Sequence, residues 1–104
     1  MILVTTPGVP GRTIAAVIGV VRGNTVRGAH LGRDLTAAFK NLVGGEIPEY
    51  TKLLAEAREQ ALDRMIAEAR ARGADAVVDV SFATCEIARG AAEFLAYGTA
   101  VKLE

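Results

Sequence analysis

The sequence contains no tryptophan, one cysteine and one histidine, and its aromatic residues are two tyrosines and three phenylalanines. The single cysteine, Cys85, excludes an intrachain disulfide framework and suits a reducing compartment, so we expect the protein in the cytoplasm. Twelve basic and twelve acidic residues give a net charge of zero. Because there is no basic run and few aromatic side chains are available to stack on bases, we expect no nucleic-acid partner.

Long apolar runs are also absent. The longest run, residues 14–21, includes Gly19, and it is far shorter than the roughly 18 residues that a membrane-spanning helix needs. Residues 1–7 have neither the basic region nor the apolar core of a signal peptide. The sequence therefore predicts no membrane partner.

What the sequence has in excess is apolar side chain. Of its 104 residues, 51% are apolar and 23% are charged, and the mean hydropathy is +0.29. A monomeric domain of this size buries only about two-thirds of the surface that its unfolded chain exposes. The surplus predicts a second buried surface, formed against other copies of the same chain in a homo-oligomer.

Two segments near the N-terminus have the composition of β-strands. Residues 2–6 form a short β-prone run that ends at a stretch rich in proline and glycine. Residues 13–22 are apolar on both of their alternating faces, whereas a strand with one solvated face alternates between apolar and polar residues. One face can pack against helices of the same subunit, and the other predicts cover by a neighbouring subunit.

Two helices are predicted next. Residues 33–43 carry apolar side chains at three- and four-residue spacing, and a pair of glycines follows them. Residues 48–72 form a longer amphipathic helix that Gly73 can end, with Glu68 and Arg72 as a favourable pair one turn apart. The apolar stripe of this longer helix consists of Tyr50, Leu53, Leu54, Ala57, Ala61, Met65, Ile66 and Ala69.

A two-residue period returns near the C-terminus. Residues 75–86 and 92–103 alternate in side-chain character, which predicts two strands joined as an antiparallel hairpin. In the first of these strands, the alternation places Val78, Val80 and Phe82 together on one face. Cys85 is then expected on the opposite face.

The predicted fold class is α+β, with the element order β-β-α-α-β-β. We expect an antiparallel sheet packed on one long helix and one short helix. The chain contains no internal repeat, low-complexity tract or linker, so residues 1–104 are interpreted as one domain.

Five short motifs follow one another along the chain, and in order and spacing they resemble those of the YbjQ family, small bacterial proteins described as "putative heavy-metal-binding". The resemblance spans almost the whole chain. It implies a dodecin-subunit-like fold and a homopentameric ring held in part by strands of neighbouring subunits, and it implies no reaction. The motifs are Gly28-Ala29 before Arg33-Asp34, Val43-Gly44-Gly45 before Tyr50, Ala57-Arg58 with Ala61, Gly73-Ala74-Asp75-Ala76-Val77-Val78, and Gly98-Thr99-Ala100-Val101.

The chain departs from the family pattern at two positions. Asp79 stands where the family more usually has glycine, and His30 stands where asparagine is common before the Arg-Asp pair. A family function that depended on either position would be altered in this member.

His30 and Cys85 are the candidate metal ligands, because imidazole and thiolate groups bind transition metals strongly. They lie far apart in sequence and neither belongs to a paired motif, so one subunit cannot build a conventional zinc site from them alone. Carboxylates such as Asp79 and Glu86 could assist a harder metal. The alternative, which we favour, is a loop histidine and a small strand cysteine without a ligand.

No set of residues predicts catalysis. Cys85 would need a base beside it to act as a nucleophile, and nearby carboxylates disfavour the thiolate. The sequence therefore favours a ring-forming homo-oligomeric binding or scaffold protein whose partner is itself. The second hypothesis is a metal-ion-binding protein, with a transition-metal ion as the candidate cofactor and a site that forms only in the assembled oligomer.

Overall fold

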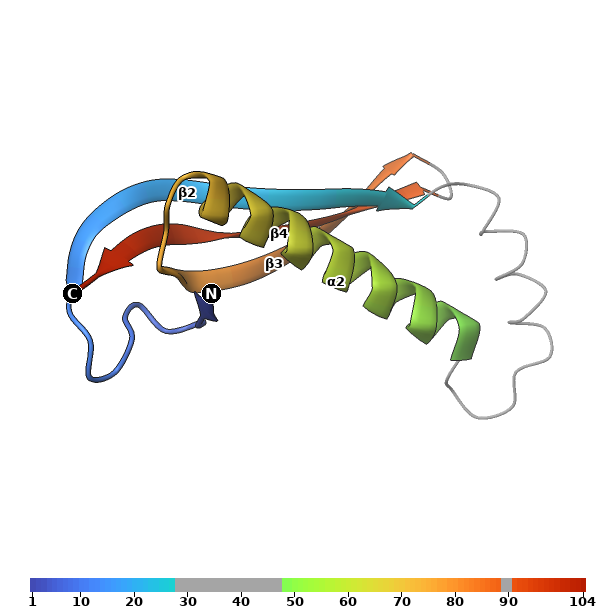
Figure 1. The fold of residues 1–104 in the computed structure, drawn as a ribbon. Coiled ribbons are helices and arrows are strands. Elements are labelled where there is room, and N and C mark those ends of the chain that lie inside the picture. Colours follow the sequence, from blue (N-terminus) through green and yellow to red (C-terminus); the bar gives the residue numbers. More distant parts are fainter. Residues whose placement is uncertain (28–47, 89–90) are drawn as a thin grey trace.

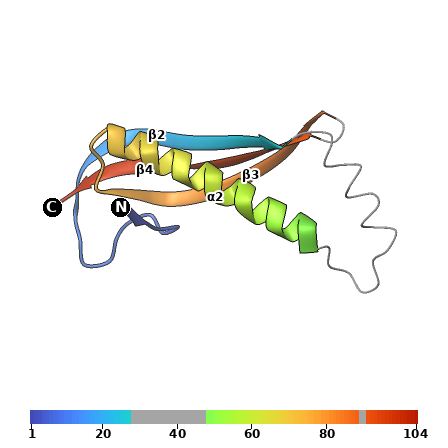
Figure 2. The same ribbon diagram turned by 45° about the vertical axis from the view of Figure 1, so that its right-hand side comes forward.

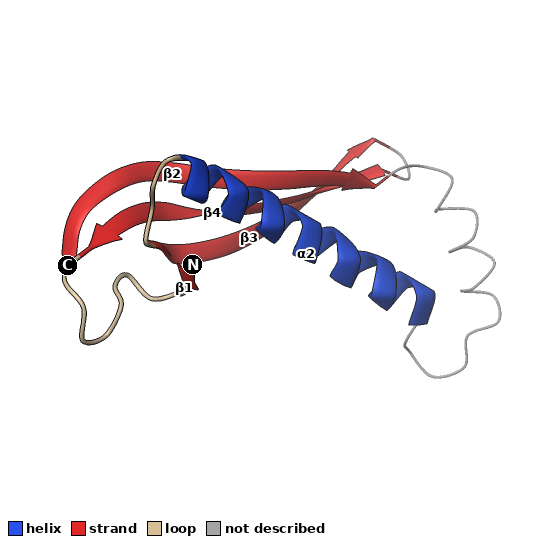
Figure 3. Cartoon of the chain, viewed as in Figure 1, coloured by secondary structure: helices blue, strands red, loops and turns tan. Residues whose placement is uncertain are grey.

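Three long strands and one short strand form a sheet with one long helix across it (Figures 1 and 3). The structure is a computed structural model and describes residues 1–27, 48–88 and 91–104. The α+β class is confirmed, and the short helix predicted at 33–43 lies outside the described residues. The elements are β1 (Ile2–Leu3), β2 (Ile14–Arg27), α2 (Pro48–Ala71), β3 (Ala76–Ala88) and β4 (Ala91–Leu103).

The sheet is mixed, with the strand order β1-β3-β4-β2. Strand β4 pairs antiparallel with β3, which confirms the predicted hairpin, and it also pairs antiparallel with β2. Strand β1 instead runs parallel to β3, with Ile2 opposite Ala76, so the expectation of a wholly antiparallel sheet was wrong. Parallel neighbours need only a long connection between them, and the chain between β1 and β3 supplies one. The alternation of residues along a strand does not indicate whether that strand pairs parallel or antiparallel with its neighbour.

The long strands set the dimensions of the subunit. Strand β2 has 14 residues and β3 and β4 have 13 each, so each is about 45 Å long, roughly twice the usual length. Figure 2 shows α2 crossing the sheet obliquely, with its C-terminal half over the strands and its first turns diverging from them. One helix therefore covers part of one face only.

Helix α2 ends as the sequence predicts. Gly73 has a φ of 77°, the left-handed conformation that glycine adopts at low cost. Its N–H donates to the carbonyl of Arg70 at 3.0 Å, and the N–H of Ala74 donates to the carbonyl of Ala69 at 3.0 Å. These two bonds form a Schellman motif, which satisfies carbonyls at the helix end and turns the chain toward β3.

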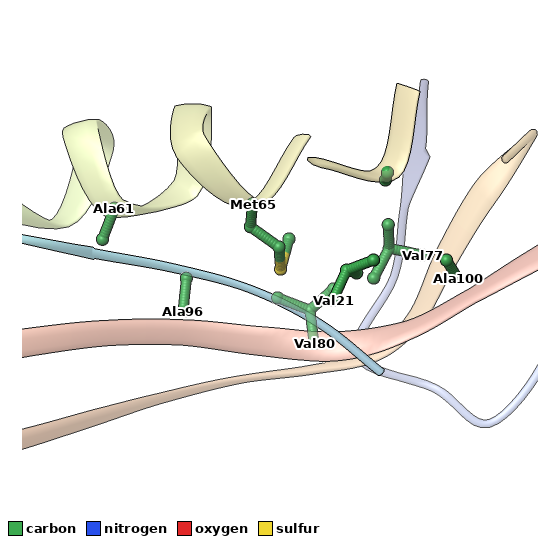
Figure 4. Packing of buried hydrophobic residues seen from close by; sticks show 8 residues of the cluster. Val21, Ala61, Met65, Val77, Val80, Ala96 and Ala100 are labelled. Carbon is green, nitrogen blue, oxygen red and sulfur yellow. The ribbon is translucent and has the colours of Figure 1, made fainter. Parts of the chain in front are cut away.

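The main core lies between α2 and the sheet (Figure 4). Ala57, Ala61, Met65 and Ala69 are fully buried, so four members of the predicted stripe face the strands. The small size of the three alanines brings the helix so close that a Cβ on Gly23 would overlap the carbonyl oxygen of Ala61. Only glycine fits at this position of β2.

A β-bulge interrupts β3 between Val78 and Ser81. Asp79, with a φ of 52°, lies in the left-handed region, and the extra residue reverses the alternation that follows. Val78 packs in a cluster on the face away from α2, whereas Val80 packs in the main core. The prediction that these two valines share a face was therefore wrong.

Candidate functional site

The two long edges of the sheet differ in how their main-chain groups are satisfied. Strand β2 is one edge, and α2 lies along it. Arg72 donates from Nη1 to the carbonyl of Val20 at 2.9 Å and from Nη2 to that of Ile18 at 3.1 Å. The N–H of Arg22 donates to Glu68 Oε2 at 3.1 Å. We call the outward side of β2 over residues 18–24 the covered edge.

Side chains of α2 can bond along the covered edge because the helix and the strand have similar repeat distances. The side chains of Arg64, Glu68 and Arg72 are one helical turn apart, and Arg64 Nη1 donates to the carbonyl of Asn24 at 2.6 Å. Four helix residues rise about 6.0 Å, and two strand residues rise about 6.7 Å. Successive turns of α2 therefore meet successive outward groups of β2. Glu68 and Arg72, which the helical spacing predicts as a pair, both bond to the strand instead.

A bulge in β2 shapes the end of this edge. The register shifts between Val17 and Gly19, and Gly19 has a φ of 138°. A Cβ on Gly19 would lie 3.1 Å from Arg72 Nη2. The glycine thus permits both the bulged backbone and the close approach of the guanidinium group.

Strand β3 forms the other edge, and β1 covers only its first part. The N–H of Asp79 donates to the carbonyl of Thr6 at 2.9 Å, and that of Val80 donates to the carbonyl of Val4 at 3.0 Å. Beyond Val80, no strand among the described residues pairs with this side of β3. We call this side of β3 over residues 81–87 the open edge. Its side chains from Phe82 to Ile87 are exposed.

The two faces of the sheet differ as well. Directly opposite residues of paired strands share a face, so Val17, Val20 and Val26 lie on the side away from α2. Their exposed fractions are 66%, 60% and 52%. Tyr97 lies on the same face and is also exposed. We call these four side chains the uncovered face.

The described residues cover one end of this face. A second cluster of buried residues, Ala76, Val78 and Val101, lies there under partly buried side chains of the N-terminal segment and of two strand ends. The remainder lacks a second layer within the described parts of the chain. The predicted doubly apolar second strand therefore has one face in the core, through Val21, and one face exposed.

The structure places one of the two predicted metal ligands. Cys85 is a free, exposed cysteine, and its Sγ donates to the carbonyl of Glu86 at 3.6 Å. His30 lies outside the described residues. Within residues 1–27, 48–88 and 91–104 there is no group of three or more histidine, cysteine, aspartate or glutamate side chains that could hold a metal ion.

Sequence reasoning missed the carboxylate beside Cys85. Glu93 of β4 lies directly opposite Cys85 on the same face, and Asn24 Nδ2 donates to its Oε2 at 3.2 Å. Glu86, which the sequence suggested, lies opposite Ala92 on the other face, and Asp79 lies at the bulge. The hairpin register could have revealed this, because centring the predicted turn near residue 89 already pairs 85 with 93.

Cys85 and Glu93 supply two metal ligands from one subunit. A structural zinc site takes four ligands and a catalytic one takes three from the protein. A site on this face that binds a metal tightly therefore needs ligands from elsewhere.

No helix in the described part of the chain combines the length and apolar character needed to cross a membrane.

Comparison with known proteins gives consistent matches over the full chain. The YbjQ family model, described as "Putative heavy-metal-binding", matches residues 1–104. A UPF0145 protein of Archaeoglobus fulgidus is 58% identical over 103 residues, which are 99% of this chain and 95% of the relative. A UPF0145 protein of Thermus thermophilus is 59% identical over 104 residues, covering 99% and 91%. The archaeal relative corrects the description of such proteins as bacterial.

A solved structure supports the fold. The crystal structure of a protein of unknown function from Pediococcus pentosaceus, assigned to the DUF74 family, superposes with a TM-score of 0.64. The match covers 100% of this chain and 98% of the other, at 15% sequence identity. At that identity the likeness concerns the fold alone.

Proposed function

Because this chain belongs to the YbjQ (UPF0145) family and has an apolar sheet face that no described segment covers, we propose that it is a subunit of a ring-forming homo-oligomer that acts as a binding or scaffold protein. The observation that carries the proposal is the uncovered face. Three half-exposed valines lie in line along β2, with a tyrosine on the neighbouring strand. Contiguous apolar surface of this kind is typical of protein–protein contacts rather than of solvated sheet faces.

The free energy gained by burying the valines of the uncovered face favours association. Complete burial of a valine side chain is worth roughly 1.5–3 kcal/mol, so covering Val17, Val20 and Val26 offsets a large part of the entropy lost when subunits associate. Arg22 and Asn24 lie between these valines on the same face. A mixture of apolar anchors with polar neighbours is the usual composition of an interface.

A ring of five copies is the stoichiometry we propose, since the sequence resemblance implies a pentameric ring of dodecin-like subunits. A ring requires a heterologous contact, in which one patch of a subunit meets a different patch of the next. We place the protein in the cytoplasm, where a single exposed cysteine such as Cys85 stays reduced. No described set of residues favours catalysis, and we assign none.

The test compares the wild type with Val20→Asp and Thr13→Asp by native mass spectrometry and sedimentation at micromolar concentration. A charge placed on the uncovered face should weaken association by about tenfold or more, because it becomes unpaired on burial. Thr13 is exposed and lies off this face, so its variant should assemble as the wild type does. A monomeric wild type, or assembly of Val20→Asp at wild-type strength, would contradict the proposal.

The second candidate function is metal-ion binding at the junctions between subunits. The observation in its favour is that Cys85 and Glu93 lie side by side on the uncovered side of the sheet, where an approaching copy could add further donors. Thiolate ligands favour Zn²⁺ and Cu⁺. Isothermal titration with Zn²⁺, Cu⁺ and Ni²⁺ on the assembled wild type, Cys85→Ser, Glu93→Gln and His30→Ala tests this. Unchanged affinity in every variant would exclude these ligands.

A further inference from the structure

Among the described residues, the open edge is the longest stretch of sheet edge that neither a strand nor side chains of α2 satisfy. In a strand bonded on one side only, alternate residues direct their N–H and C=O groups outward. Exposed edges of this kind usually carry protection, such as proline, lysine or a bulge within the segment. Residues 81–87 contain no proline and no lysine, and Glu86 is their one charged residue. The bulge at Asp79 precedes the segment.

The occupant of the open edge can be identified by elimination among the described strands. The covered edge of β2 cannot accept another strand, because Arg64, Glu68 and Arg72 already bond to its outward groups. Strand β1 has two residues, too few to pair along residues 81–87. The described edge of matching length is the open edge of another copy. Two identical edges that meet form an isologous contact about a two-fold axis.

We propose that the open edge pairs antiparallel with the open edge of a second copy, with the two-fold axis at Thr84. This inference rests on the homo-oligomer proposed above and specifies one of its contacts. Thr84 is the midpoint of residues 81–87, so this register pairs the whole segment. Glu86 then lies opposite Phe82 of the second copy, and the two Thr84 side chains face each other. Like charges do not meet, and threonine pairs across strands are favourable.

The register is constrained by hydrogen-bond geometry. Directly opposite residues of an antiparallel pair must both direct their main-chain groups toward the partner or both away from it. For a strand paired with itself, this condition requires the axis to pass through a residue rather than between two. The pairing would join two four-stranded sheets, with α2 of both copies on one side and both uncovered faces on the other. The uncovered faces thus stay available for the ring contact.

The decisive experiment uses two variants of opposite charge at the axis, Thr84→Lys and Thr84→Glu. Thr84 is exposed, so either side chain is compatible with the subunit fold, which circular dichroism and thermal unfolding verify. In each variant alone, like charges meet across the axis, and the pairing should weaken by about tenfold or more. An equimolar mixture should restore assembly, because lysine then meets glutamate.

Native mass spectrometry reads the result, with one variant ¹⁵N-labelled so that mixed species are resolved. We expect each single variant to show half the wild-type subunit number, or monomers, and the mixture to regain the wild-type mass with the two labels in equal numbers. Thr13→Lys and Thr13→Glu, at an exposed site away from the open edge, are the matched controls. Wild-type mass in both single variants, or random label distribution in the mixture, would overturn the proposed pairing.

A second measurement does not depend on charge. With Cys85→Ser as background, Thr84→Cys places one thiol of each copy at the axis, within disulfide distance. In the wild type, Cys85 lies diagonally from its equivalent at about 7–8 Å between Cα atoms, so oxidation should cross-link it more slowly. Faster cross-linking of the wild type through Cys85 than of the double variant through its introduced thiol would contradict the register.

The outcomes separate this inference from the proposed function. A wild type that assembles while Thr84→Lys and Thr84→Glu assemble equally well refutes the edge pairing and leaves the ring intact. A monomeric wild type refutes both. Loss of assembly in Val20→Asp together with halved mass in the Thr84 variants supports two distinct contacts.

Discussion

The two outer edges of one sheet are treated in opposite ways by this chain. Along β2, arginine and glutamate side chains of α2 bond to the outward main-chain groups. Along β3, the short β1 reaches only as far as the bulge, and no described strand pairs with the outer side of residues 81–87. These bonds occupy the main-chain groups that another strand would need in order to pair with β2. We infer from this difference that strand addition is blocked at β2, and we propose that association is directed to β3.

The largest expected effect comes from separating α2 from the covered edge. Gly23→Ala places a Cβ in overlap with the carbonyl oxygen of Ala61 and the main-chain nitrogen of Met65. Because backbone atoms cannot yield as a flexible side chain can, we expect a loss of about 3 kcal/mol in the free energy of unfolding. Urea denaturation at fixed protein concentration measures it. Gly8→Ala, which meets nothing within 4 Å, should change stability by less than about 0.5 kcal/mol, and equal losses would contradict the close approach of helix and strand.

A smaller effect is expected from removing one link of the covered edge. Arg72→Met keeps much of the side-chain length and deletes both donors, leaving the carbonyls of Ile18 and Val20 to water. We expect a loss of about 1–2 kcal/mol, because these groups are partly solvated. Arg70→Met, an exposed neighbour on the same helix, is the control. If the two variants unfold at the same denaturant concentration, the bonds to β2 contribute no stability.

The smallest effect concerns the bulge that ends the covered part of β3. Asp79 is exposed and holds a φ of 52°, a conformation that costs a residue with a Cβ roughly 1–2 kcal/mol, less for aspartate. Asp79→Gly should therefore stabilise the subunit by about 0.5 kcal/mol, and Asp79→Ala should destabilise it by about 1 kcal/mol. Differential scanning calorimetry can rank the three proteins. The order Gly, Asp, Ala from most to least stable is expected, and any other order argues against a strained bulge.

Much of the fold was predictable because its signals are local. The stripe ending at Ala69 and the glycine stop at Gly73 defined α2 to within one residue, and the two-residue period located β3 and β4. The direction of β1, by contrast, depends on contacts between segments as far apart in sequence as Ile2 and Ala76. The sequence contains one local signal of the bulge at Asp79, which is a non-glycine residue at a position where the family usually has glycine. That departure could have signalled a left-handed backbone.

The candidate surfaces were harder to predict than the elements. The apolar excess predicted a surface buried against other copies, because composition counts side chains that a small core cannot hold, and that burial stays a prediction. The described residues show an apolar sheet face in the single subunit. The covered edge was not foreseen: Glu68 and Arg72 appeared as a surface pair, since a helical pattern cannot show which strand lies beside it. The pairing of Cys85 with Glu93 likewise depended on a hairpin register that the alternation alone did not fix.

The central claim is that this chain works as a homo-oligomer, and the mass of the wild-type protein tests it most directly. Native mass spectrometry of the untagged protein, diluted through the micromolar range, should give one assembled species. Its mass should be a multiple of about 55 kDa, five times the 10.9 kDa subunit. A single species at 10.9 kDa throughout that range would contradict the claim.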